Sequence, residues 1–421
     1  MPVLYDLGTG LYHAAIRLAA PWKPKAAAWV KGREGMWSRL EAERGELHGC
    51  LWMHCASAGE FEQGRPVLEA IKKERPDLPV LLTFFSPSGF EARKAFPLAT
   101  HVEYLPPDTR VNAQRLQELL RPKVAIFVKY EFWYHHLQAL RENGTPTFLV
   151  SALFRNNQPF FRWYGGTWRR MLQGFKQIYT QDQASMDLLA GLGLRNVSVG
   201  GDTRFDRVAR IIQDDGQLPL AEAFAGEAPS LVCGSTWPED ERLLGEALKG
   251  MGKAAPKCFV VPHELQEAQL EATEKRFPKP LARWSELENG DPANIAATLG
   301  AERHGTLLVD RMGLLARLYR YGNLAYVGGG FTDGIHSVLE AAAWGVPVIF
   351  GPKYRKFPEA QGLIDNGAGV AVKDAAGLKN ALESWLGDPE AQQMAAAAAN
   401  KFVQDHKGAA HTVAQAVLKA L

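Results

Sequence analysis

Short apolar runs alternate with longer amphipathic runs along most of the chain from Leu51 onward. The first series reads LWMHCA, GRPVLEAIKKERP, PVLLTFF, GFEARKAF, KVAIFVKY, YHHLQALRENG and PTFLVSAL, and further units follow at QIYTQD and VSVGGD. A buried strand followed by a helix, repeated, is typical of a parallel sheet that helices cover on both faces. The pattern therefore predicts an α/β domain over residues 46–205.

A second alternating series occupies residues 229–421 and predicts a second α/β domain. It reads SLVCGST, ERLLGEALKGM, KCFVVPHE, TLLVD, NLAYVGGG, SVLEAAAWG, PVIFGP and GAGVAV. Between the two series, residues 206–228 are polar and acidic with Gly and Pro, which predicts an interdomain linker. Two such domains imply a cleft, because open parallel sheets bind ligands beyond the carboxyl ends of their strands. An alternative for the last helix of the second domain is that it packs back on the first domain.

Residues 1–45 predict a helical, membrane-proximal segment ahead of the first domain. Met1–Pro21 carries leucines on one side at helical spacing, but it is too short and too polar for a transmembrane span. Trp22, Trp29 and Trp37 then lie among lysines and arginines, a mixture that suits anionic lipid headgroups. An amphipathic helix packed on its own domain explains the same pattern, so both interpretations stay open.

Composition narrows the classes of partner. The 421 residues are 46% hydrophobic and 22% charged, which is ordinary for a globular protein. Because the net charge is only +2, the composition gives no argument for a nucleic-acid partner. The four cysteines show no CxxC or metal-finger spacing, and no DxD pair follows a strand, so we expect a reducing compartment and no metal site.

The most informative segment is LAYVGGGFTDGIHSVLEAAAWGVPVIFGP, residues 324–352. A strand runs into three glycines, Gly328–Gly330, and a helix is expected to begin near His336. Backbone amides and a helix N-terminus at a strand exit form a phosphate site. Glu340, four residues after His336, is expected on the same helix face, where it accepts from a ribose hydroxyl. A tight glycine turn without a ligand is the alternative.

This segment resembles the nucleotide-binding half of GT-B glycosyltransferases through GGGF, G-x-H, LEAA, G-x-P-V and FGP. Further motifs resemble those of the bacterial Kdo transferases, in the order of that family: HCASAGEFEQG with a later TFFSPSG, KYEFWYHH, GDTRFDR and GSTWPEDE. The resemblance extends over about residues 50–370. It implies a GT-B fold, with two Rossmann-like domains that face each other across a cleft.

The resemblance implies transfer of Kdo from CMP-Kdo to a glucosamine hydroxyl of a lipid A precursor, with inversion and without a cofactor. The implied location is the cytoplasmic face of the bacterial inner membrane, with peripheral or monotopic attachment to an anionic membrane surface. A different GT-B enzyme, such as a UDP-sugar transferase or a UDP-GlcNAc 2-epimerase, shares the glycines and Glu340. A scaffold without activity is a third reading, although it has no need of Glu60.

Glu60 matches the family's general base, which takes the proton of the acceptor hydroxyl as the new bond forms. Its alternative role is that of a carboxylate at a helix N-terminus. The expected acceptor-binding residues are Ser57, Gly59, Ser86 and Arg155. Arg155 precedes a basic and aromatic stretch that suits a lipid acceptor, or else a helix with an aromatic side in the core.

The expected donor-binding residues lie mostly after strands of the second domain. They are Ser235, Thr236, His263, Gly328, Gly329, Gly330, Phe331, Gly334, His336, Ser337, Glu340 and Lys356. Ser235 and Thr236 are also ordinary helix-capping residues. In the first domain, Glu131 and Arg204 are expected to contact the sugar or a phosphate. The alternatives are an ion pair of Glu131 with Lys129 or Arg155, and a linker salt bridge of Arg204.

Several positions depart from the family pattern. The chain has Trp237 in place of a His, His263 in place of an Arg, Ser337 and Lys356 each in place of an Asn, and Tyr134-His135 in place of a Pro-Asn pair. Loss of the Arg removes a fixed positive charge from the donor site, and Lys356 is a candidate to restore it.

Overall fold

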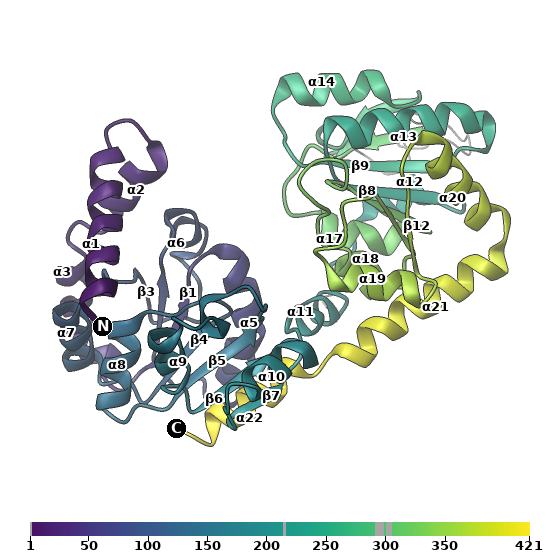
Figure 1. Ribbon diagram of the computed structural model, residues 1–421. Coiled ribbons are helices and arrows are strands. Elements are labelled where there is room, and N and C mark those ends of the chain that lie inside the picture. The colour runs from purple at the N-terminus through teal and green to yellow at the C-terminus, as the bar shows by residue number, and fades with distance from the viewer. Residues whose placement is uncertain (1, 214–215, 291–298, 300–304) are drawn as a thin grey trace. The chain divides into compact units, whose positions relative to one another are not determined.

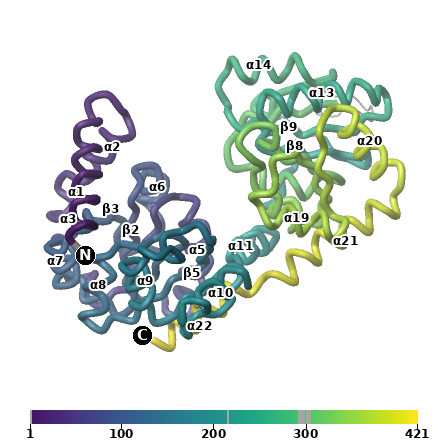
Figure 2. The backbone as a smooth tube through the Cα atoms, in the orientation of Figure 1, coloured from purple at the N-terminus to yellow at the C-terminus, as the bar shows by residue number. Residues whose placement is uncertain are grey.

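The computed structural model describes residues 2–213, 216–290, 299 and 305–421, in two compact units (Figures 1 and 2). The first unit consists of Met1–Arg207 together with Lys407–Leu421, and the second of Val208–His406. Met1 of the predicted N-terminal segment, and positions 214 and 215 of the predicted linker, lie outside the described residues.

The first unit is built on a seven-stranded parallel sheet with the order β3-β2-β1-β4-β5-β6-β7. Its strands are β1 (Leu51–Cys55), β2 (Val80–Phe84), β3 (His101–Tyr104), β4 (Val124–Val128), β5 (Thr147–Ala152), β6 (Gln177–Thr180) and β7 (Val197–Val199). The central strand β1 pairs in register with β2 through Leu51 and Val80, and with β4 through Leu51 and Val124. Strand order turns around β1, so the carboxyl ends of β1 and β4 form the topological switch point at which α/β proteins bind ligands.

Helices cover both faces of this sheet. They are α1 (Pro2–Ala19), α2 (Pro24–Gly32), α3 (Met36–Ala42), α4 (Arg44–Leu47), α5 (Ala58–Glu74), α6 (Pro87–Arg93), α7 (Arg110–Leu120), α8 (Tyr134–Glu142), α9 (Gly166–Leu172), α10 (Gln183–Ala190) and α22 (Ala409–Leu418), with the 3-10 turn η1 (Pro159–Phe161). Alternation along β1 separates two cores. Leu51 and Met53 pack with α5 and α22, whereas Trp52 packs with α3, α7 and α8.

The second unit repeats this architecture with a sheet of order β10-β11-β9-β8-β12-β13-β14, all parallel. Its strands are β8 (Ser230–Thr236), β9 (Lys257–Pro262), β10 (Leu281–Arg283), β11 (Gly305–Leu308), β12 (Leu324–Val327), β13 (Val348–Phe350) and β14 (Gly369–Ala371). Its described helices are α12 (Pro219–Ala225), α13 (Pro238–Met251), η2 (Gly252–Ala254), α14 (Glu267–Arg276), α15 (Trp284–Leu287), α17 (Leu315–Leu318), η3 (Tyr319–Tyr321), α18 (Leu339–Ala343), α19 (Pro358–Asp365), α20 (Ala375–Gly387) and α21 (Pro389–His406). Helices α13, α20 and α21 close one core over β8 and β12.

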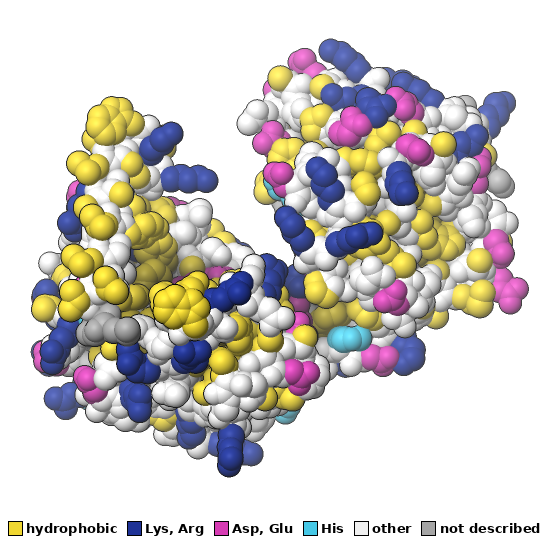
Figure 3. All heavy atoms as spheres, in the orientation of Figure 1, with side chains coloured by type: hydrophobic (Ala, Val, Ile, Leu, Met, Phe, Trp, Pro, Cys, Tyr) yellow, Lys and Arg dark blue, Asp and Glu magenta, His cyan; other side chains and the backbone are white. Residues whose placement is uncertain are grey.

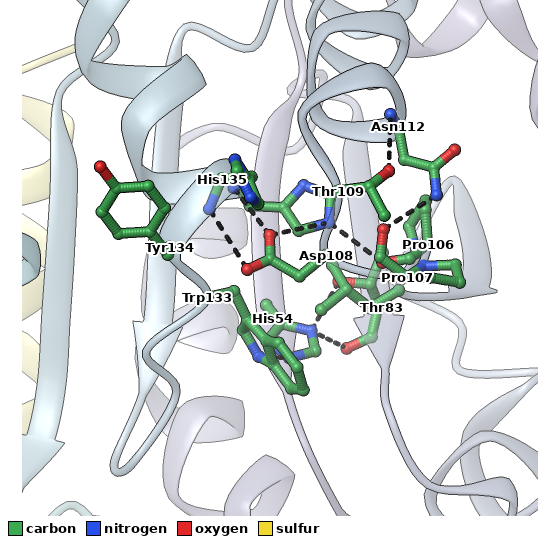
Figure 4. Close-up of polar contacts among 12 residues, drawn as sticks. His54, Thr83, Pro106, Pro107, Asp108, Thr109, Asn112, Trp133, Tyr134 and His135 are labelled. Carbon is green, nitrogen blue, oxygen red and sulfur yellow. Dashed lines mark hydrogen bonds and ion pairs between the residues drawn. The ribbon is translucent and has the colours of Figure 1, made fainter. Parts of the chain in front are cut away.

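The N-terminal helices are anchored to the first unit by buried polar contacts. The Tyr5 hydroxyl donates to Asp108 at 2.5 Å, and Asp108 also accepts from the backbone amides of His135 and His136 at the start of α8 (Figure 4). Arg33 stacks on the Trp29 ring at 3.8 Å and donates to the backbone carbonyl of Phe85 at 2.9 Å. Burial lowers the pKa of Arg33 to about 9. The segment 1–45 therefore packs on its own unit while α1 keeps an exposed apolar side.

The described residues of the predicted linker include helical turns. Helix α11 (Arg204–Ile211) enters this segment, and α12 buries Leu220 and Phe224 in the second unit. The boundary between the two compact units, after Arg207, falls within residues 206–228. At the other end, α22 lies against α5, and the Asp206 carboxylate accepts from the amides of Gly408 at 2.8 Å and Ala410 at 3.1 Å. A carboxylate at the first turn of a helix satisfies amides that have no partner within the helix.

Candidate functional site

The loop after β1 turns directly into α5 and places Glu60 in the first turn of that helix. Ser57 is the N-cap residue, and its hydroxyl accepts from the Glu60 amide at 3.3 Å. Glu60 Oε2 accepts from the Ala56 amide at 2.6 Å. Glu60 is therefore a carboxylate in the first turn of a helix, and it also lies at the carboxyl end of the central strand, where a general base is expected.

A second loop closes against the first. The Ser86 amide donates to the Ala56 carbonyl at 2.8 Å, and the Ser86 hydroxyl caps α6 by accepting from the Gly89 amide at 3.1 Å. A Cβ at Gly89 would stand 3.0 Å from the Ala58 amide nitrogen, so glycine permits this close approach. Ser57, Gly59 and Ser86, three of the four expected acceptor residues, thus lie with Glu60 around the N-terminal ends of α5 and α6.

The proton affinity of Glu60 is unusually high for a carboxyl group. Burial and the negative charge of Glu131 raise the pKa of Glu60 to about 7, against the opposing effects of the Ala56 amide and Lys129. A general base works best when its pKa lies near the working pH. Glu60 therefore has the proton affinity that proton abstraction at neutral pH requires.

Glu131 is fixed by a histidine and a tryptophan. Its Oε2 lies 2.9 Å from Nε2 of His54 and accepts from Nε1 of Trp133 at 2.6 Å. His54 is fully buried on β1, and its Nδ1 lies 2.9 Å from the Thr83 hydroxyl. Figure 4 shows the His54 ring beside the Trp133 indole, with dashed lines to Thr83. His54 and Trp133 thus hold the Glu131 carboxylate in a fixed orientation.

Arg155 and Arg204, the two arginines expected to contact a ligand, differ in their surroundings within the first unit. Arg155 is exposed. Burial raises the pKa of Tyr130, and the charge of Arg155 opposes this shift while that of Glu60 adds to it. Arg204 forms an ion pair with Asp202 at 2.6 Å, close to its alternative role as a structural salt bridge. In the stretch after Arg155, Phe160 is buried whereas Trp163 is 92% exposed, so the aromatic residues are divided between core and surface.

In the second unit, the three glycines form a turn that the backbone requires. A Cβ at Gly328 or at Gly330 would stand within 3.0 Å of backbone atoms of Ser235 and Gly351 respectively, and Gly329 has φ +91°. The Gly328 amide donates to the Gly234 carbonyl at 2.9 Å, and the Gly329 amide to Asp240 at 2.8 Å. These two amides therefore already donate within the protein, and the assignment of the glycines to the donor stays a prediction.

Three aromatic rings adjoin this turn. His263 stacks on Trp237 and on His336, with 4.6 Å between ring centroids in each pair. Trp237 Nε1 donates to His336 Nε2 at 3.0 Å, and burial together with His263 lowers the pKa of His336. A hydrogen bond thus joins Trp237 to His336, and the exposed ring of His263 stacks on both. The lowered pKa keeps His336 uncharged at neutral pH.

The expected helix at His336 begins three residues later. The His336 amide bonds back to the Gly328 carbonyl at 3.1 Å, and α18 starts only at Leu339. His336 and Glu340 therefore do not share a helix face, and α18 is too short to offer an extended dipole. Phe331 packs beside Gly351, Gly334 beside Phe357, and Ser337 and Lys356 are exposed. Ser235 has φ +51°, and the α13 cap is Trp237 with Asp240 rather than Ser235 or Thr236.

Sequence reasoning missed His54, Trp133 and Asp240. Asp240 is fully buried and joins the β8 and β12 exits, since it accepts from Trp237, Tyr326 and Gly329. A polar residue inside an apolar strand was the available signal for His54. Among the described residues, no three His, Cys, Asp or Glu side chains converge to hold a metal ion.

Comparisons with known proteins place these features in one family. Residues 28–207 match a family model described as 3-deoxy-D-manno-octulosonic-acid transferase (kdotransferase). A 3-deoxy-D-manno-octulosonic acid transferase of Aquifex aeolicus is 30% identical over 80% of this chain and 86% of its own length. That of Bordetella pertussis is 27% identical over 96% of this chain and 97% of its own.

Solved structures confirm the fold class. A UDP-GlcNAc 2-epimerase from Neisseria meningitidis matches with a TM-score of 0.61 at 14% identity, over 88% of this chain and 99% of the other. MurG from Acinetobacter baumannii matches with a TM-score of 0.55 at 15% identity, over the same shares. At such identities the likeness shows the GT-B fold alone. From the sequence relatives, the chain belongs to the 3-deoxy-D-manno-octulosonic acid (Kdo) transferases.

Proposed function

We propose that this Kdo transferase moves Kdo from CMP-Kdo to a glucosamine hydroxyl of the lipid A precursor lipid IVA, with inversion at the anomeric carbon. The observation that carries the proposal is the buried carboxyl of Glu60, with a pKa of about 7, at the carboxyl end of the central strand. Family membership supplies the sugar that is transferred. The product is an inner-core intermediate of lipopolysaccharide.

In the proposed step, the acceptor oxygen attacks the anomeric carbon of Kdo while Glu60 takes the hydroxyl proton. The bond from that carbon to the CMP phosphate oxygen breaks, and its electron pair leaves with CMP. A single displacement inverts the anomeric centre. The leaving phosphate needs charge stabilisation rather than a proton, so one general base suffices.

The second unit holds the donor in this proposal. The stacked rings of Trp237, His263 and His336 border the nucleotide, and Glu340 accepts from the ribose. Because this ring cluster carries no fixed charge, the cationic side chain of Lys356 is assigned to the donor phosphate or carboxylate. Ser235, Thr236 and the amide of Gly330 complete the set.

The acceptor side belongs to the first unit. Ser57, Gly59 and Ser86 line the loops around Glu60, and Arg155 is assigned to a phosphate of the lipid. Glu131 is assigned to a sugar hydroxyl, which its fixed orientation favours. Arg204, already paired with Asp202, has a weaker claim to a ligand.

The first helix is the proposed membrane contact. Leu4, Leu7, Leu11 and Leu18 of α1 are 58–73% exposed, and Trp22 after it is 77% exposed. Figure 3 shows hydrophobic side chains gathered over α1 and α2, with basic side chains beside them. In the part of the chain that the structure describes, no helix meets the length and apolarity needed to cross a bilayer. We place the enzyme on the cytoplasmic face of the inner membrane, held peripherally or monotopically by an anionic surface.

Incubation of the enzyme with CMP-Kdo and tetraacylated lipid A precursor tests the function. We expect release of CMP and a lipid product heavier by one or more Kdo residues, with inverted configuration by NMR. A parallel incubation with UDP-GlcNAc tests the nearest alternative, a GT-B enzyme that acts on a UDP-sugar. Fold similarity alone does not distinguish the two functions. Turnover of UDP-GlcNAc without use of CMP-Kdo, or a product with retained configuration, contradicts the proposal.

A further inference from the structure

The hydrogen bonds of His54 determine where its hydrogens lie. Nδ1 stands 3.1 Å from the Thr83 carbonyl oxygen, which can only accept. The Thr83 hydroxyl, 2.9 Å from Nδ1, receives the Trp52 indole hydrogen at 2.9 Å and can send its own hydrogen to the Met53 carbonyl at 3.4 Å. The carbonyl contact therefore favours a hydrogen on Nδ1, and a neutral His54 in that tautomer would present a bare lone pair at Nε2.

That lone pair would face a carboxylate. Nε2 of His54 lies 2.9 Å from Oε2 of Glu131, and an ionised Oε2 is also an acceptor. Trp133 Nε1 has a single hydrogen, and it lies nearer to Oε2 at 2.6 Å than to Nε2 at 3.1 Å. Two buried acceptors at hydrogen-bond distance repel each other unless a proton lies between them. The free-energy cost of leaving them without a hydrogen is high where no water can reach.

We propose that His54 and Glu131 hold one proton between Nε2 and Oε2, and that His54 is a positioning residue that offsets part of the charge of Glu131 beside Glu60. The pair then carries no net charge, either as imidazolium with carboxylate or as imidazole with carboxylic acid. Glu60 is left as the carboxyl group in this site that exchanges its proton with the acceptor. The catalytic part of this inference rests on the proposed function, whereas the shared proton does not.

Other titratable groups face the pair or Glu60 from neighbouring elements. Lys129 and Tyr130, after β4, face Glu60, and so does Cys55 at the end of β1. His136 of α8 faces His54, with Asp108 behind it. Burial raises the pKa of the Cys55 thiol and lowers that of His136, so both are uncharged at neutral pH. Among these neighbours, Lys129 lowers the pKa of Glu60 and so opposes the effect of Glu131.

The kinetic test compares the pH dependence of kcat/KM in the parent and in His54→Gln. Glutamine cannot hold the extra proton, so Glu131 becomes a bare carboxylate and Glu60 ionises less readily. We expect the acidic midpoint of the profile to rise by at least about half a pH unit, a shift typical of a nearby like charge. Glu131→Gln removes the carboxylate whose charge helps to raise the pKa of Glu60, so its midpoint should fall below the parent value.

His135→Gln is the matched control, because this histidine of the same unit pairs with Asp6 instead. Its acidic midpoint should equal that of the parent. An unchanged or lowered midpoint in His54→Gln, in an active and folded protein, overturns the assignment of His54. Thermal unfolding of each variant shows whether it is folded.

A second readout needs neither activity nor a variant. In the ¹⁵N-histidine-labelled enzyme without substrate at neutral pH, we expect the signals of both Nδ1 and Nε2 of His54 to differ from the signal of a bare ring nitrogen. A bare Nδ1 or a bare Nε2 overturns the shared proton. If the parent makes no product from CMP-Kdo but this spectrum is found, the proposed function fails and the proton assignment stands.

Discussion

Glu60 lies in the first turn of α5, and its surroundings raise its pKa. The carboxylate bonds to the Ala56 amide, which lowers its proton affinity, but burial and Glu131 outweigh that effect. For a base, the active form is the deprotonated one. We therefore expect kcat/KM to fall as the pH drops below about 7, the pKa of Glu60 in the folded protein.

The same pKa would lie near the ordinary glutamate value if Glu60 were solvated. The measurement is kcat/KM against pH with CMP-Kdo and a soluble acceptor, so that vesicle binding does not contribute. A profile that stays flat down to about pH 5 contradicts the assignment of this raised pKa to the catalytic base.

Trp237 tests the donor side at the same scale. Trp237→Ala removes the ring on which His263 stacks, and base or ring stacking on an aromatic side chain contributes about 1–3 kcal/mol. We expect the Kd for CMP to rise about tenfold by calorimetry. Trp237→Phe keeps a stacking ring but loses the hydrogen bond to His336, so it should retain most of the affinity. Equal Kd values for parent and Trp237→Ala would exclude this ring from the donor site.

Residue types and motif order were enough to single out Glu60, Glu131, Ser57 and His336. They were not enough to show which partners these side chains choose. His54 meets Glu131 only because β1 and β4 are neighbours in the sheet, 77 residues apart along the chain. Such a contact depends on strand order, which a local pattern does not encode.

At the scale of elements, the glycine turn is a structural requirement first. A Cβ at Gly328 would overlap the Ser235 backbone, so Gly328→Ala should destabilise the second unit by about 1–3 kcal/mol through overpacking. Gly387→Ala is the control, because a Cβ there has no neighbour within 4 Å. Urea unfolding measures both variants. Equal midpoints for the two would show that the turn relaxes around a side chain.

The strands and long helices were predictable from periodicity, whereas short elements were not. The helix expected at His336 starts at Leu339, because the chain first folds back to bond with Gly328. Likewise α12 lies within a segment for which the sequence pattern predicted only an interdomain linker. In both cases a few tertiary contacts decide the conformation of a segment shorter than two or three helical turns.

At the scale of the whole molecule, the α/β class and its two parallel sheets follow from the alternating series. The assignment of 407–421 to the first unit depends on contacts between distant parts of the chain, notably the Asp206 cap of α22. The proposed attachment to a membrane likewise depends on the folded α1 surface, because folding leaves the leucines of this helix together on an exposed side.

The double variant Leu7→Asp/Leu11→Asp tests that surface. Both side chains are more than half exposed, so folding should be unaffected, while each loses about 1.5–3 kcal/mol of apolar burial in the membrane interface. We expect sedimentation with anionic vesicles to fall at least tenfold. Met394→Asp, 63% exposed on α21, is the control and should sediment like the parent. Unchanged sedimentation of the double variant removes α1 from the membrane contact.

The central claim, that Glu60 is the general base, is tested most directly by Glu60→Gln. The amide oxygen can still accept from Ala56, so the loop is retained while the base is lost. Glu74→Gln, at the exposed end of the same helix, is the control. Single-turnover release of CMP from CMP-Kdo with lipid acceptor should be about 10²–10⁴-fold slower in Glu60→Gln and unchanged in Glu74→Gln. A rate for Glu60→Gln within a few-fold of the parent would contradict the claim.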